Sequence, residues 1–225
     1  AAMAVATGQA DVVAVYRSMA EGTSGRLRVA VSQNDTSRHF LLNGLDSPVQ
    51  IGAPRTTRLL EKMGVPRSTM EAISLASYYQ AKKNPSAYAY GFELDHETYD
   101  SSRWISEPYK LFDCSRENDA GIAVLVTSAE RAEEMRQKPA YILSAPMGSP
   151  GEWASLEEID MRSPIMTSAG MAGVAKKLWK ESGYGPEDVD VAQVYENMTG
   201  LSVSAIVDHG FCSHQNAGEF ITYDN

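Results

Sequence analysis

Two kinds of hydrophobic pattern alternate along the chain. Apolar runs of strand length, typical of strands buried on both faces, occur at 11–16, 120–126, 140–145 and 189–194. Helix-like segments lie between and around them, at 1–9, 55–63, 68–83, 130–138, 171–182 and 199–209. This alternation predicts an α/β protein built around a mostly parallel sheet.

Local signals mark the ends of several helices. Ser68 to Glu71 and Thr127 to Glu130 have the spacing of capping boxes, which predicts that helices begin there. Glycines at 64, 183 and 210 predict helix ends, because glycine readily adopts the left-handed conformation that closes a helix. Residues 22–52 are polar, contain glycine and have no sustained period, so we predict a loop there.

The stretch 87–112 is irregular and dense in Tyr, Phe and Trp. A long aromatic loop region is typical of a lid, a binding surface or a dimer contact. The alternative is a satellite hydrophobic cluster beneath a surface excursion, and the pattern does not distinguish the two.

Charge and composition narrow the class of protein. The 225 residues carry a formal net charge of -9, which argues against nucleic acid or an anionic membrane as the main partner. No apolar run approaches the roughly 20 residues that span a bilayer. The only cysteines, Cys114 and Cys212, suit a reducing compartment, and we expect the cytoplasm.

Candidate chemistry concentrates at Tyr195-Glu196-Asn197, directly after the last apolar run. In open α/β sheets, ligands sit beyond the carboxyl ends of the strands, so these side chains are well placed for catalysis. The alternative is that Tyr195 packs its ring while the other two serve as turn residues. Dinucleotide, phosphate-loop and zinc motifs are absent from the sequence, so we expect no metal site. Cys114 reads as an inert thiol, and Asp113 and Asp119 as residues that bond to nearby backbone.

Several longer stretches resemble a known family: GQADVVAVYRSMAEG, NPSAYAYG, SRWISEPYKLFDC, NDAGIAVLVTSAERA, and DVDVAQVYENMTG with DHGFC. Together they resemble the thiolase superfamily, and within it the sterol-carrier-protein-type thiolases labelled lipid-transfer proteins. The resemblance implies a layered αβα fold with two related βαβαβαββ halves and an inserted loop domain.

On that pattern, residues 1–27 end the N-terminal half, 28–112 form the loop domain, 113–138 supply the last strand and helix of that half, and 139–225 begin the C-terminal half. We therefore expect the chain to be part of a longer protein, with a nucleophilic cysteine expected only outside it.

One family position differs in an informative way. Thiolases have Asn-Glu-Ala-Phe, or His-Asp-Cys-Phe in the sterol-carrier type, where this chain has Tyr195-Glu196-Asn197-Met198. A tyrosine at this position is similar to what distinguishes the steroid side-chain aldolases from other members of the family. The resemblance implies retro-aldol cleavage of a β-hydroxyacyl-CoA, such as a steroid side-chain thioester, to a ketone and propionyl-CoA. Tyr195 would transfer a proton, and Glu196 or Asn197 would orient it.

The expected substrate is an acyl-CoA, with coenzyme A as part of the substrate and no other cofactor. Substrate-binding candidates are Tyr88, Tyr90, Trp104, Arg55 and Arg58, although solvated surface charges are the favoured explanation of the two arginines. The resemblance also implies a homodimer and a partner with an OB-fold (DUF35-type) domain. Two alternatives stay open: a 3-ketoacyl-CoA thiolase that acts through cysteine, and a non-catalytic homologue that binds acyl-CoA or lipid.

Overall fold

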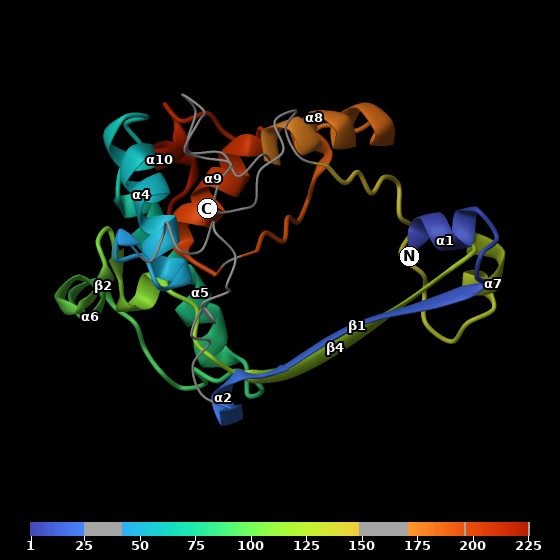
Figure 1. Cartoon of the computed structure of the whole chain (residues 1–225), viewed down its shortest axis with the longest axis horizontal. Coiled ribbons are helices and arrows are strands. Elements are labelled where there is room, and N and C mark those ends of the chain that lie inside the picture. Colours follow the sequence, from blue (N-terminus) through green and yellow to red (C-terminus); the bar gives the residue numbers. More distant parts are fainter. Residues whose placement is uncertain (25–41, 149–170, 196, 225) are drawn as a thin grey trace.

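The computed structural model describes residues 1–24, 42–148, 171–195 and 197–224. A cluster of helices lies at one side of the molecule, and a long two-stranded ribbon leads away from it to α1 (Ala2–Ala6) and α7 (Ala129–Glu133) (Figure 1). The cluster is formed by α4 (Pro48–Glu61), α5 (Ser68–Lys83), α9 (Thr199–Asp208) and α10 (Ala217–Phe220).

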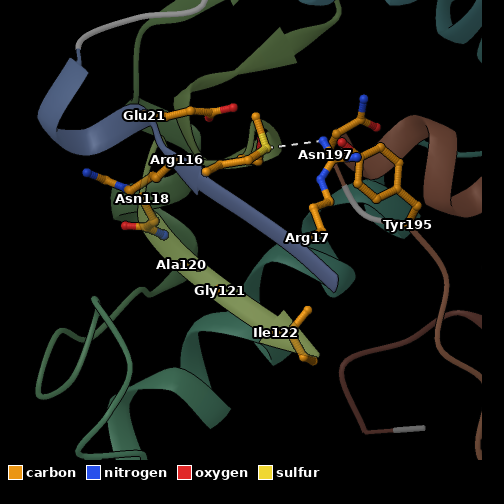
Figure 2. A pocket seen from close by; sticks show the side chains of 11 residues that line it. Arg17, Glu21, Arg116, Asn118, Ala120, Gly121, Ile122, Tyr195 and Asn197 are labelled. Atoms are coloured by element: carbon orange, nitrogen blue, oxygen red, sulfur yellow. Dashed lines mark hydrogen bonds between the residues drawn. The ribbon is translucent and has the colours of Figure 1, made fainter. Parts of the chain in front are cut away.

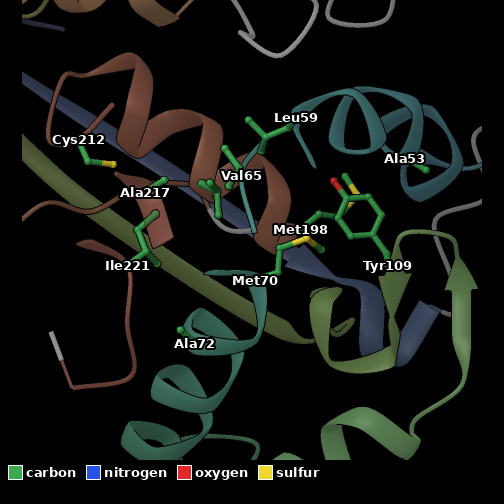
Figure 3. Close-up of a cluster of buried hydrophobic side chains, with 11 residues drawn as sticks. Ala53, Leu59, Val65, Met70, Ala72, Tyr109, Met198, Cys212, Ala217 and Ile221 are labelled. Atoms are coloured by element: carbon green, nitrogen blue, oxygen red, sulfur yellow. The ribbon is translucent and has the colours of Figure 1, made fainter. Parts of the chain in front are cut away.

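The hydrophobic core lies mainly among these four helices and, apart from Tyr109, is built from medium-sized and small side chains (Figure 3). Its fully buried members include Leu59 of α4, Met70 of α5, Val203 of α9 and Ala217 of α10. The core also takes in Met198, which immediately precedes α9, and is therefore continuous with the backbone that carries the predicted site.

The helix boundaries follow local capping chemistry. Helix α4 begins at Pro48 rather than at the predicted Arg55, because Ser47 and Gln50 form a capping box ahead of it. Helix α5 spans its predicted range, but Ser68 is already its first helical residue and Arg67 is the N-cap, so the predicted capping box does not form. Helix α7 is capped by Ser128, whose Oγ accepts a hydrogen bond from the backbone N of Arg131.

The aromatic region contains α6 (His96–Ser101), β2 (Trp104–Ser106), β3 (Tyr109–Lys110) and the 3-10 turn η1 (Leu111–Asp113). Tyr99 and Tyr109 are fully buried, whereas Tyr88 and Tyr90 are exposed. The buried residues fit the interpretation as a packed cluster, whereas a role of the exposed ones as a lid, a binding surface or a dimer contact stays a prediction.

The ribbon pairs β1 (Val12–Ala20) with β4 (Asp119–Thr127) in antiparallel orientation, with Val12 opposite Thr127 and Ala20 opposite Asp119. The short helix α2 (Glu21–Ser24) follows β1, and the carboxylate of Asp119 accepts a hydrogen bond of 3.0 Å from the backbone N of Thr23 there. Both strands were expected from their apolar runs, but most of their side chains are exposed rather than buried.

The other two predicted strands, 140–145 and 189–194, do not form within the described ranges, and neither does the expected parallel sheet. A strand exists only through hydrogen bonds to a neighbour, and in the described ranges no segment runs alongside these two. Their apolar side chains are left in solvent, and Val191 is 79% exposed. The predicted domain boundaries at 27/28, 112/113 and 138/139 stay predictions.

Helix α8 (Met171–Ser182) matches its predicted range and packs on α9. Trp179 donates a hydrogen bond of 3.0 Å from Nε1 to the carbonyl of His209, the C-cap of α9. The turn η2 (Pro186–Asp188) then leads toward the predicted site. Across the described ranges, none of the helices has the length and apolar character needed to cross a membrane.

The crossing of α4 and α9 generates a stability prediction. A Cβ at Gly200 would overlap the side chain of Thr56, which is fully buried. We expect Gly200→Ala to lower the free energy of unfolding by about 1–3 kcal/mol through overpacking. The control is Gly173→Ala in α8, where no described residue beyond the local helix backbone lies within 4 Å of the added carbon and a gain of about 0.4–1 kcal/mol is expected. Urea unfolding measures both, and equal midpoints for the two variants would contradict the close packing.

Candidate active site

A cavity of about 610 Å³ lies where the ribbon meets the segment that leads into α9 (Figure 2). Two of the three predicted catalytic residues, Tyr195 and Asn197, line it, and Glu196 lies outside the described residues. The opposite wall comes from β1 and β4. The remaining lining residues are Arg17, Met19, Glu21, Ser115, Arg116, Asn118, Ala120, Gly121 and Ile122.

Tyr195 and Asn197 present their polar groups in different environments. The Tyr195 side chain is 79% exposed, so its phenol is accessible from solvent. Asn197 is half-buried, and within the described part of the chain its Oδ1 is buried without a hydrogen-bond partner. A buried acceptor left without a donor is costly, so the described residues leave one hydrogen bond unmade at this side chain.

Two arginines line the same cavity. Arg17 projects from β1 toward Tyr195 and Asn197, and Arg116 follows η1 (Figure 2). Arg116 donates a hydrogen bond of 3.1 Å to Oη of Tyr78, and its guanidinium lies 5.7 Å from the centre of the Tyr88 ring. The cavity therefore combines a phenol and an amide with two cationic groups, an arrangement suited to an anionic or electron-rich ligand.

The backbone around Asn197 is fixed by a short antiparallel arrangement with residues 113–115. The backbone N of Ser115 donates to the carbonyl of Asn197 at 2.9 Å, and Cys114 forms a β-bridge with Met198. At the next position, Oγ1 of Thr199 donates to Oδ1 of Asp113 at 2.9 Å. These three successive links, here called the 113–199 clamp, hold the chain immediately after Tyr195.

The carboxylate of Asp113 is fully buried and accepts four hydrogen bonds. Besides Thr199, its donors are Oη of Tyr99 at 2.8 Å, Nη2 of Arg67 at 3.1 Å and the backbone N of Lys110 at 2.8 Å. Burial is the main cause that raises the pKa of Tyr99 well above its ordinary value, and the negative charge of Asp113 raises it further. This phenol therefore stays a proton donor. The sequence identified only the local backbone bond, because the other donors are remote in sequence.

The predicted substrate-binding residues are dispersed. Tyr88 borders the cavity through its contact with Arg116, and Tyr90 is exposed nearby in the chain. Trp104 lines a separate cavity with Arg67, whose guanidinium lies 4.8 Å from its ring centre. Arg55 and Arg58 are half-buried on α4 and line neither cavity.

The cavity arginines were missed by the sequence interpretation. Arg17 follows the apolar run 11–16 directly. A charged residue that continues an apolar strand was the available signal that this position faces a polar site. Arg116 lies in a polar turn, where its sequence surroundings resemble those of any surface arginine.

Comparisons with known proteins now place the chain. The family described as thiolase C-terminal domain-like matches residues 151–225. The chain is 34% identical to the 17-hydroxy-3-oxo-4-pregnene-20-carboxyl-CoA lyase of Mycobacterium tuberculosis, over 98% of this chain and 59% of that protein. It is 33% identical to the steroid side-chain-cleaving aldolase of Thermomonospora curvata, over 100% of this chain and 59% of that protein.

Among solved structures, the Ltp2-ChsH2(DUF35) aldolase superposes with a TM-score of 0.87 at 34% identity, covering 98% of this chain and 57% of that one. The thiolase-like fold expected from the sequence is confirmed by this match. The chain spans about three-fifths of the length of the curated relatives it matches.

The two cysteines give a prediction that tests whether a thiol of this chain can act as a nucleophile. Burial raises the pKa of Cys114 to about 12 and also raises that of Cys212. At pH 8 we expect iodoacetamide to alkylate Cys114 about a thousandfold more slowly than a free thiol, because only the thiolate reacts. The rate should increase about tenfold for each pH unit up to about 11.

Peptide mass spectrometry measures this labelling, and the same protein in denaturant serves as the control. Labelling of folded Cys114 at the rate of a free thiol near neutral pH would contradict its assignment as an inert side chain.

Proposed function

Because the chain belongs to the thiolase superfamily, we propose that it supplies catalytic residues of an acyl-CoA aldolase, a carbon–carbon lyase. The substrate we propose is a β-hydroxyacyl-CoA with a steroid side chain. The observation that carries the proposal is that Tyr195 lines the same cavity as Asn197, in a chain similar to steroid side-chain-cleaving aldolases.

The proposed reaction is a retro-aldol cleavage. The β-hydroxyl group loses its proton, its oxygen becomes a ketone, and the bond between the α and β carbons breaks. The electron pair of that bond forms an enolate of the short acyl-CoA, which takes up a proton and leaves as propionyl-CoA. The reaction thus needs one proton to be removed and one to be returned, and we assign Tyr195 to this proton transfer.

Asn197 and the arginines suit the charge that develops. In the proposed reaction negative charge accumulates on the thioester oxygen of the enolate, and hydrogen-bond donors aimed at that oxygen lower the barrier. The amide of Asn197 lies on the cavity wall next to Tyr195, and Arg17 is directed toward both. Arg116, on the same cavity, is our candidate for the phosphates of coenzyme A.

The assembly that we propose is a homodimer that joins a DUF35-type partner, in the cytoplasm. The relative of known structure is named as a complex with such a partner, which supports the hetero-oligomer. Exposed apolar residues of the ribbon, among them Ile122 and Leu125, provide surface for association. Light scattering of the protein with and without the partner measures both assembly states.

Removal of one hydroxyl tests the catalytic assignment. We expect Tyr195→Phe to lower kcat for cleavage by about 10²–10⁴-fold with little change in KM, because a proton-transfer group is lost while the ring remains. The control is Tyr184→Phe, an exposed tyrosine that does not line the cavity, which should behave as wild type. A Tyr195→Phe enzyme with the wild-type kcat would remove Tyr195 from the mechanism.

The same assay identifies the reaction. The protein, alone and with a DUF35-type partner, receives a branched β-hydroxyacyl-CoA, and separately a β-ketoacyl-CoA with free CoA. Propionyl-CoA and a ketone from the first substrate alone support the aldolase. Chain-shortened acyl-CoA from the second alone would mean thiolysis, and binding without turnover would mean a non-catalytic homologue.

A second substitution tests the anion site. We expect Arg116→Gln to raise KM for acyl-CoA by about 10- to 100-fold with kcat within about twofold, since one charge-assisted hydrogen bond contributes about 1.5–3 kcal/mol. Arg136→Gln, at an exposed arginine outside the cavity, is the matched control. An unchanged KM with a reduced kcat would show that Arg116 acts on the transition state instead.

A further inference from the structure

The position of Tyr195 depends on what holds the chain after it. Residues 189–195 make no strand pairing in the described ranges, and Val191 is largely exposed. The 113–199 clamp begins at Asn197, two positions beyond Tyr195, and fixes the backbone there. A displacement of the clamp therefore moves Asn197 directly, and we expect it to change the position of Tyr195 two residues earlier.

The clamp is fixed in turn by the buried carboxylate of Asp113. Oδ1 receives the hydroxyls of Tyr99 and Thr199, and Oδ2 receives Arg67 and the backbone N of Lys110. A carboxylate without access to water depends on these donors, because no solvent can replace a lost one. Thr199 therefore stays bound to one oxygen atom in one orientation.

The same donors connect the catalytic segment to the aromatic region. Arg67 also packs its guanidinium over Trp104, and Tyr99 belongs to α6 of that region. Thr199 is the first residue of α9, directly after Met198 of the clamp. The carboxylate of Asp113 thus connects the aromatic region to the start of α9 by hydrogen bonds.

We propose that Asp113 is a positioning residue that sets Tyr195 and Asn197 at the cavity wall, acting through the hydroxyl of Thr199. The effect of this positioning on catalysis rests on the proposed function, whereas the positioning of the backbone by Asp113 does not depend on it. Asp113 touches neither the cavity nor a substrate; its effect passes through Thr199 and the backbone of the clamp.

The test removes the hydroxyl and then restores it. Thr199→Val keeps the shape of the side chain but cannot donate to Asp113, and Thr199→Ser retains the donor. We expect Thr199→Val to lower kcat at least about tenfold at nearly constant KM, because small misplacements of catalytic groups are costly. Thr199→Ser should recover kcat to within about threefold. Asp113→Asn is the direct variant, and the threonine pair keeps the test valid where that protein fails to fold.

A readout without catalysis accompanies the kinetics. Amide hydrogen exchange, followed by mass spectrometry on peptides covering 193–201, should be about tenfold faster in Thr199→Val than in Thr199→Ser. The matched control is Thr69→Val, which removes another fully buried threonine hydroxyl, bonded to the carbonyl of Pro66 at 2.8 Å. We expect this control to lose stability without faster exchange at 193–201.

The outcomes separate the two proposals. Faster exchange with a lower kcat, both recovered by serine, supports positioning by Asp113. Unchanged exchange in Thr199→Val, or a kcat that falls only with the folded fraction as in Thr69→Val, would overturn it. Faster exchange with an unchanged kcat would show that the Thr199 hydroxyl fixes this segment but would overturn its importance for catalysis, whereas the role of Tyr195 is decided separately by Tyr195→Phe.

Discussion

The carboxylate of Asp113 is removed from water, and the relative placement of four chain segments depends on how its charge is compensated. Burial of a charge costs several kcal/mol unless hydrogen bonds and an opposite charge replace the lost hydration. Arg67 supplies the charge, and Tyr99, Thr199 and a backbone amide supply the remaining bonds. Each donor comes from a different part of the chain. The charge is therefore compensated only when these parts are correctly assembled around it.

The chemistry of the site arises from local electrostatics rather than from the overall charge. The chain is acidic, yet the cavity that holds Tyr195 is bordered by Arg17 and Arg116. In the proposed mechanism, a phenol, an amide and two guanidinium groups provide proton transfer and stabilisation of negative charge without a thiolate. Both cysteines lie in surroundings that raise their pKa, which is the opposite of what an activated nucleophile needs.

The sequence predicted those features that depend on neighbouring residues. Helices α5, α8 and α9 match their predicted ranges because the hydrophobic period, and the glycines that follow α8 and α9, are local signals. The apolar run before Tyr195 and Asn197 pointed to two residues that line the cavity, while their catalytic role stays a prediction. Strand pairing could not be predicted, since an apolar run does not reveal which segment will hydrogen-bond to it. The same limit hid Arg17, and it made Asp113 look like a turn residue whose bonds are all local.

The sequence separations within the Asp113 cluster imply an order of assembly. Lys110 is 3 residues from Asp113, Tyr99 is 14 and Arg67 is 46, whereas Thr199 is 86 residues away and is synthesised last. The donors that are closer in sequence can therefore form hydrogen bonds to the carboxylate before α9 is synthesised, so that the charge is not buried without partners during folding. Closing the 86-residue loop to Thr199 has the largest entropic cost of the four, so we expect this hydrogen bond to form after the other three.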